Sequence, residues 1–111
     1  MKPFFSLVLF VALGVLLAQA PPGNAENGKR LFVRDGCYEC HGYSGQGGAG
    51  ARIAPKVLPA ATFIAYVRHP AGAMPPYTAK VASDADLTDI RAYLATIPEP
   101  PPLKNIPILN Q

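Results

Sequence analysis

This sequence has little net charge and few patterns typical of β-strands. The 111-residue chain has ten Lys and Arg and seven Asp and Glu, so its formal net charge is only +3 at pH 7. With no run of basic residues and no interleaved aromatic patch, that balance argues against a nucleic-acid-binding surface. Convincing strands, hairpin turns and internal repeats are also missing, so helices and loops are the expected structure.

Side chains that could fill a hydrophobic core are scarce as well. The chain has 13 prolines and 10 glycines among its 111 residues. A domain of under about a hundred residues often needs a disulfide, a metal or a cofactor to supplement so small a core. We therefore expect such a group in this protein.

The first twenty residues have the pattern of a secretory signal peptide. A positive start at Lys2, an apolar run over 4–18 and the sequence Ala-Gln-Ala ending at Ala20 are the three parts of that signal. We expect residues 1–20 to be cleaved, which leaves a periplasmic chain without a stable membrane span. An uncleaved membrane anchor is the alternative, although a transmembrane helix needs about twenty apolar residues.

Both cysteines of the chain lie in the segment "CYECH" at 37–41. Two free thiols would not stay unbonded in an oxidising compartment. A disulfide or redox C-x-x-C motif is one interpretation, but that motif is typical of a βαβ context and does not need the histidine. Zinc is another, but it takes four ligands, and no second cysteine pair is present to join Cys37, Cys40 and His69.

Covalent haem attachment is the interpretation that uses the whole segment, because C-x-x-C-H is its local signature. The thiols of Cys37 and Cys40 would add to the two vinyl groups on one edge of the porphyrin, while the imidazole of His41 reaches the iron from one face. We therefore predict one covalently bound haem c. The second ring nitrogen of His41 should be held by a backbone carbonyl. Pro55 is the candidate for that acceptor, and an ordinary turn residue is its alternative role.

The sixth ligand of the iron is predicted to be Met74. Once the signal is removed, Met74 is the only methionine. Pro75 and Pro76 hold its segment extended and prevent a helix, which suits a rigid loop that presents a thioether. His69 is the rival ligand, although a histidine at a helix end also serves by interacting with the last carbonyls.

Three helices are predicted around these segments. The first follows Asn24 as its cap, ends near 35–36 and turns Gly28, Leu31 and Phe32 inward. The second covers 60–68, with Phe63, Tyr66 and Val67 inward. The third runs from the cap Ser83 to about 97, with Asp86 completing a capping box and Leu87, Ile90 and Leu94 on its apolar face.

Three stretches of the chain resemble small monohaem class I cytochromes c of bacteria: "CYECH" at 37–41, "RHPAGAMPPY" at 68–77 and "SDADLTDIRAYLATIP" at 83–98. The resemblance implies an all-α, class I cytochrome c fold of three to four short helices and loops wrapped around one haem. It implies that the first and last helices cross and pack through Gly28 and Phe32 against Ile90 and Tyr93. It also implies thioether bonds at Cys37 and Cys40, with His41 and Met74 as axial ligands.

The domain organisation expected on this basis has three parts. The signal peptide covers 1–20, a cytochrome c domain covers 21–97, and a proline-rich extended tail covers 98–111. The tail lies outside the resemblance, and it would either wrap the domain or dock a partner.

The implied function is one-electron transfer by haem iron cycling between Fe(III) and Fe(II), which makes the protein an electron carrier and not an enzyme. It would act as a soluble shuttle or as the cytochrome subunit of a periplasmic dehydrogenase. The partners expected are redox protein donors and acceptors, such as a periplasmic dehydrogenase or a terminal oxidase. Peroxidase-like catalysis or sensing at a displaceable sixth ligand is the alternative.

Basic residues are concentrated in one part of the chain. Seven lie between 29 and 80, against two acidic residues in the same stretch: Lys29, Arg30, Arg34, Arg52, Lys56, Arg68 and Lys80 against Asp35 and Glu39. These bases would either frame the haem edge and steer an acidic partner, or simply solvate the surface.

Overall fold

The computed structural model describes residues 22–111, and the predicted signal peptide lies outside this range. Four α-helices follow in order, α1 (Ala25–Arg34), α2 (Cys37–His41), α3 (Ala60–Arg68) and α4 (Asp84–Ala95), and no strand is present between 22 and 111. The all-α prediction is confirmed. None of the helices in the described range has the length and apolar composition needed to span a bilayer.

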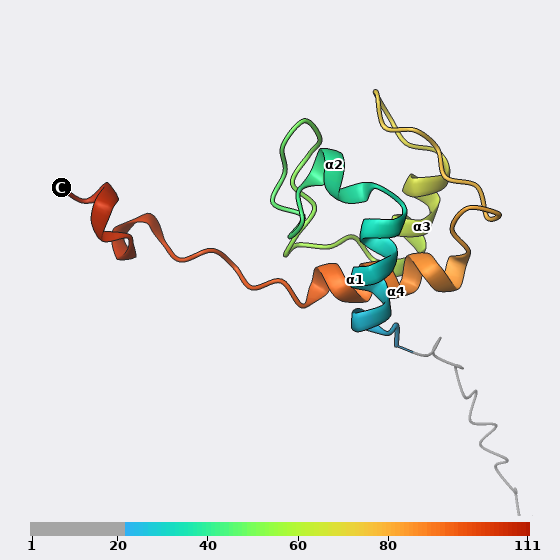
Figure 1. Ribbon diagram of the computed structural model, residues 1–111, viewed down its shortest axis with the longest axis horizontal. Coiled ribbons are helices and arrows are strands. Elements are labelled where there is room, and N and C mark those ends of the chain that lie inside the picture. The colour runs from blue at the N-terminus through green and yellow to red at the C-terminus, as the bar shows by residue number, and fades with distance from the viewer. Residues whose placement is uncertain (1–21) are drawn as a thin grey trace, which may run out of the picture.

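Helices α1 and α4 form the centre of the fold, with α1 lying across α4 (Figure 1). Their contact is made by backbone as well as side chains. A Cβ atom built on Gly28 would overlap the carbonyl of Asp89 and lie 2.8 Å from the nitrogen of Ile90. The rings of Phe32 and Tyr93 pack beside this point with centroids 5.7 Å apart. The predicted packing of the first and last helices is therefore confirmed, and Gly28 is required because only a residue without a side chain permits this approach.

Local capping explains where these two helices begin. The side chain of Asn24 accepts a hydrogen bond from the backbone of Asn27 and caps α1. At α4, Ser83 Oγ accepts from the backbone N–H of Asp86 at 3.0 Å, and the Asp86 carboxylate accepts from the Ser83 N–H at 3.2 Å. Both predicted caps are present. Helix α4 ends at Ala95, slightly before the predicted end at 97.

Helix α3 packs against α4 through a narrow stripe. Phe63 and Val67, four residues apart on one face, are both 8% exposed. Tyr66 is 44% exposed, so its predicted inward position was wrong. The reason is geometric: residues at i and i+4 share a helix face, and a short helix with one contacting neighbour buries only that stripe.

The C-terminal tail leaves the domain after α4 and extends away from it (Figure 1). Residues 98–102 have no regular structure, and two short 3-10 helices follow, η1 (Leu103–Asn105) and η2 (Pro107–Leu109). The amide of Asn110 closes them by donating to the carbonyls of Leu103, Lys104 and Ile106 at 3.0–3.1 Å. The prediction of an extended tail therefore holds for 98–102 and is wrong for 103–109, where only Pro107 interrupts a sequence that can turn.

Candidate functional site

The segment "CYECH" forms α2, a single helical turn between two glycines. Gly36 and Gly42 both have positive φ, +73° and +76°, which glycine adopts without steric cost. These turns let the chain reverse from α1 into α2 and then into the following loop. In a helix, Cys37 shares a face with the residues three and four positions on, Cys40 and His41. The two thiols and the imidazole are therefore presented together.

The imidazole of His41 is held by the backbone of the loop after α2. Its Nδ1 lies 2.6 Å from the carbonyl oxygen of Ala51. Because a carbonyl can only accept, Nδ1 carries the proton and Nε2 keeps its lone pair. The ring is thus oriented with one nitrogen available as a metal ligand, the arrangement that ligating histidines need.

The acceptor is Ala51, so the prediction of Pro55 was wrong. The loop after α2 folds back on the helix through two hydrogen bonds, from Gly47 N to His41 O and from Gly50 N to Cys40 O, both 2.8 Å. A Cβ on Gly50 would lie only 3.1 Å from His41 Cε1, so glycine permits this close return. The segment 42–50 is rich in glycine, which permits such a close return. The spacing of residues along the sequence does not, however, predict where its backbone returns to α2.

Both cysteines are free in the structure, with Cys37 half-buried and Cys40 exposed. Burial, helped by the charge of Asp35, raises the pKa of the Cys37 thiol to about 11. In the part of the chain that the structure describes, no cluster of three or more His, Cys, Asp or Glu side chains could hold a metal ion. Two thiols beside an imidazole with an open Nε2 are the set of groups that covalent haem attachment uses.

Met74 lies in the loop between α3 and α4. Its side chain is half-buried and packs against the hydrophobic core, as does Cys37. In Figure 1 this loop and α2 rise on the same side of the α1–α4 pair. His69, the rival ligand, is exposed at the end of α3, where its backbone N–H donates to the carbonyl of Ala65 at 3.1 Å.

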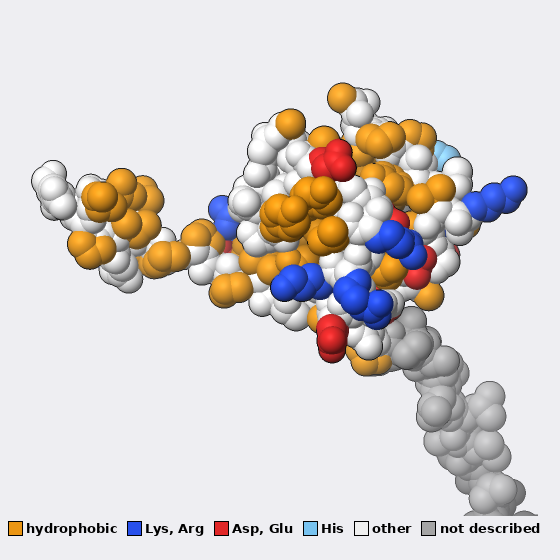
Figure 2. Space-filling view, in the orientation of Figure 1, with side chains coloured by type: hydrophobic (Ala, Val, Ile, Leu, Met, Phe, Trp, Pro, Cys, Tyr) orange, Lys and Arg blue, Asp and Glu red, His pale blue; other side chains and the backbone are white. Residues whose placement is uncertain are grey.

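Several of the basic side chains are already paired. Arg34 lies 2.7 Å from Asp35, Arg68 lies 2.6 Å from Asp84, and Arg52 lies 3.8 Å from Glu99. Figure 2 shows acidic side chains among the Lys and Arg side chains on the face in view. The local excess of positive charge counted from sequence is thus partly neutralised, and this pairing weakens the case for a single basic docking face.

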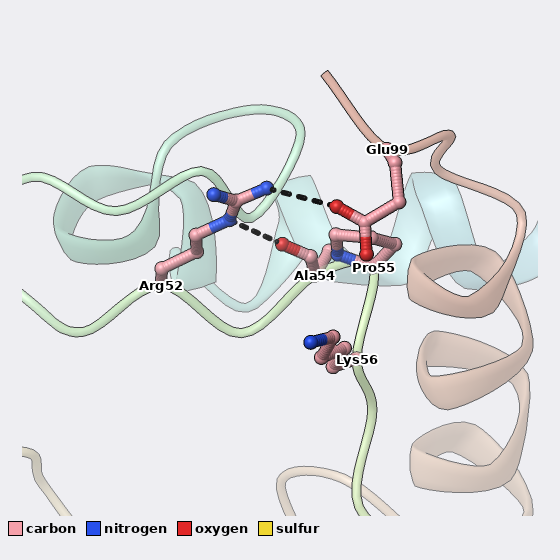
Figure 3. A pocket seen from close by; sticks show the side chains of 5 residues that line it. All are labelled: Arg52, Ala54, Pro55, Lys56 and Glu99. Atoms are coloured by element: carbon pink, nitrogen blue, oxygen red, sulfur yellow. Dashed lines mark hydrogen bonds and ion pairs between the residues drawn. The ribbon is translucent and has the colours of Figure 1, made fainter. Parts of the chain in front are cut away.

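A small pocket lies where the tail leaves the domain (Figure 3). Arg52 spans it, donating from Nε to the Ala54 carbonyl at 2.8 Å and pairing through Nη2 with Glu99. Pro55 and Lys56 complete the lining. None of the predicted haem-binding residues, Cys37, Cys40, His41 and Met74, lines this pocket, so it forms no part of the candidate site.

Comparison with known families identifies the family of this domain. Residues 23–94 match the family model described as cytochrome c oxidase, cbb3-type, subunit III. The chain belongs to this family. Neither a curated protein nor a solved structure gave a match.

Membership confirms the resemblance to small c-type cytochromes, the fold class and the cofactor. A c-type cytochrome domain binds haem c covalently, and Cys37 and Cys40 are the two cysteines that attach it. The protein therefore functions in haem-based electron transfer. A covalently bound haem would supplement a domain whose own buried residues are few.

Proposed function

We propose that this protein is the cytochrome subunit of a larger periplasmic redox complex, in which His41 and Met74 hold the haem iron. The hydrogen bond from His41 Nδ1 to Ala51 O is the observation that carries the ligand assignment, because it leaves Nε2 oriented and free. When bound, haem c supplies one-electron chemistry, alternating between ferric and ferrous iron. The predicted signal peptide at 1–20 is the basis for the proposed periplasmic location.

Two protein ligands would make the site an electron carrier. If His41 and Met74 both held the iron, no coordination position would remain for a substrate, and thioether ligation would raise the reduction potential. Peroxidase-like or sensing chemistry would need an open or displaceable sixth position together with acid–base groups. The chain has two histidines, and the one other than His41 is His69, which is exposed at the end of α3.

The test of the ligand set is the absorption spectrum of the ferric holoprotein. Thioether ligation produces a weak far-red band, which we expect in the wild type and expect to be absent from Met74→Leu. The same substitution should lower the reduction potential. His69→Ala is the matched control and should leave both unchanged. A wild-type spectrum without the band would contradict Met74 ligation and favour the open-site alternative.

The tail favours a subunit over a freely diffusing shuttle. Three of its apolar side chains are largely exposed, Leu103 at 71%, Ile108 at 75% and Leu109 at 60%. Helices η1 and η2 contact each other and no other helix of residues 22–111. The prolines at 98 and 100–102 stiffen the connection, and the Asn110 amide orders the end, so little conformational entropy remains to be lost on binding.

The partner that this tail fits is a protein with an apolar groove. A short ordered segment on a proline-rich spacer binds through a few apolar anchors. The single basic residue of the tail, Lys104, supplies little attraction to an anionic membrane surface. The family description, which names a subunit of an oxidase, supports assembly with a respiratory complex. A periplasmic dehydrogenase is the alternative partner complex.

Native gel electrophoresis of the periplasmic and membrane fractions tests the subunit proposal. The full chain should migrate with an oxidase or dehydrogenase activity, and the variant Ile108→Ser/Leu109→Ser should migrate alone with an unchanged haem spectrum. Lys104→Ala, which alters the same segment without removing an apolar anchor, should still migrate with the complex. Free migration of the wild type would indicate a soluble shuttle.

A further inference from the structure

Within the segment 70–77, which carries Met74, the hydrogen bonds to the rest of the described chain are made by Tyr77. The backbone N–H of Tyr77 donates to the carbonyl of Val67 at 3.1 Å, and its own carbonyl accepts from Arg68 Nη1 at 3.0 Å. Arg68 is in turn held by Asp84 at 2.6 Å, with its side chain only 16% exposed. The base of the loop is therefore closed against the end of α3.

The side chain of Tyr77 makes a second connection, to the segment that carries the haem-attaching cysteines. Its hydroxyl donates to the carbonyl oxygen of Asp35 at 2.7 Å, two residues before Cys37. The ring is half-buried and packs against the hydrophobic core. One side chain thus joins the Met74 loop to the start of α2.

The other side of the loop has no such attachment. Among the described residues, the hydrogen bonds found near the loop involve His69 and Tyr77, and none involves residues 70–76. Gly72 has φ of +70°, and a Cβ built on it would meet nothing within 4 Å. Apart from the packing of Met74 against the core, the segment is therefore held from its C-terminal side.

Two prolines stiffen the segment between Met74 and Tyr77. Pro75 and Pro76 separate Met74 from Tyr77, and each ring fixes its own φ near −65° while restricting the residue before it. The segment 74–77 therefore has few internal rotations. Fixing Tyr77 at one end fixes the direction in which the thioether of Met74 points.

We propose that Tyr77 is a positioning residue for the Met74 ligand, acting through its hydroxyl bond to Asp35. This inference rests on the ligand set proposed above. Loss of the hydroxyl would remove the side-chain link from the loop to Asp35, so the Met74 thioether would be displaced more readily. The net contribution of one such hydrogen bond corresponds to about a fivefold change in an equilibrium constant.

The experiment measures how readily added imidazole displaces the thioether in ferric holoprotein, followed by loss of the far-red band. In Tyr77→Phe we expect about fivefold tighter apparent imidazole binding than in the wild type. The reduction potential should fall as well, because the thioether bond that favours ferrous iron is weakened.

Tyr93→Phe is the matched control. Its hydroxyl also donates to a backbone carbonyl, that of Tyr43 at 2.6 Å, but it joins α4 to the loop after α2 and not to the Met74 loop. Both variants should lose similar thermal stability, and only Tyr77→Phe should bind imidazole more tightly. Equal imidazole affinities in the two variants would overturn the role of Tyr77 while leaving Met74 ligation intact. A wild type without the far-red band would instead overturn the ligand set, and this inference with it.

Discussion

The α1–α4 crossing and the C-terminal tail are stabilised in opposite ways. At the crossing, backbone meets backbone at Gly28 and Asp89, and aromatic rings fill the space beside them. In the tail, prolines and the Asn110 amide hold a shape that buries almost nothing. The first region is specified by packing against a distant part of the chain, and the second by local stiffness. Substitutions should therefore have large effects on folding at the crossing and small ones in the tail.

The largest effect is expected where a side chain is added to the crossing. Gly28→Ala would place a methyl group on the backbone carbonyl of Asp89, which cannot rotate away as a flexible side chain could. We expect a loss of at least about 3 kcal/mol in the free energy of unfolding, measured by urea denaturation of the holoprotein.

Gly72→Ala is the matched control for that substitution. It adds the same methyl group at φ of +70° but in open space, so only backbone strain opposes it. That strain should cost about 1 kcal/mol. Similar losses in the two variants would show that the crossing is less tightly packed than the structure indicates.

A smaller effect is expected from a hydrogen-bonded carboxylate at the same crossing. Asp89 accepts from Asn27 Nδ2 and from the backbone N–H of Asn24, each at 2.7 Å. Those bonds, the Asn27 contact first, lower the pKa of Asp89 in the folded state. Its contribution is therefore complete above the unfolded pKa of about 4 and is lost as pH falls through the lower folded value.

Asp89→Asn should remove that contribution. Because the site is partly open to solvent, we expect a loss of about 1 kcal/mol at pH 7 and a shallower decrease of stability below pH 4. Thermal unfolding across pH 2–7 measures both quantities. Glu26→Gln, which removes an exposed charge from the first turn of α1, is the control and should change stability by less than about 0.5 kcal/mol. An unchanged acid profile in Asp89→Asn would contradict the assignment.

The smallest effect should come from the tail. Its described ion pair with the domain, Arg52–Glu99, spans 3.8 Å with both side chains at least half exposed. Such a pair contributes between 0 and about 1 kcal/mol. Deletion of residues 98–111 should therefore leave the melting temperature of the isolated holoprotein nearly unchanged. A large decrease would mean that the tail packs on the domain in solution, which would remove the contrast between the two regions.

Features that depend on neighbouring residues were predictable from sequence. The caps Asn24 and Ser83 and the bounds of α1 and α3 follow from turns, periodicity and hydrogen bonds within a few positions. Haem attachment was predictable for the same reason, because the chemistry of Cys37, Cys40 and His41 is contained in five consecutive residues. Where the local signal was mixed, as after the proline run at 98–102, the prediction was wrong.

Contacts between distant segments could not be predicted from neighbouring residues in the sequence. The carbonyl that orients His41 belongs to Ala51 and not Pro55, because the path of a glycine-rich loop depends on hydrogen bonds that no residue pattern encodes. The exposure of Tyr66 depends on which face of α3 meets α4. Sequence by itself determined α1, α3, α4 and the chemical identity of the cofactor site, since these depend on short-range spacing. Tertiary structure alone decided which groups orient the ligands, because that depends on the chain returning to the site from far along its length.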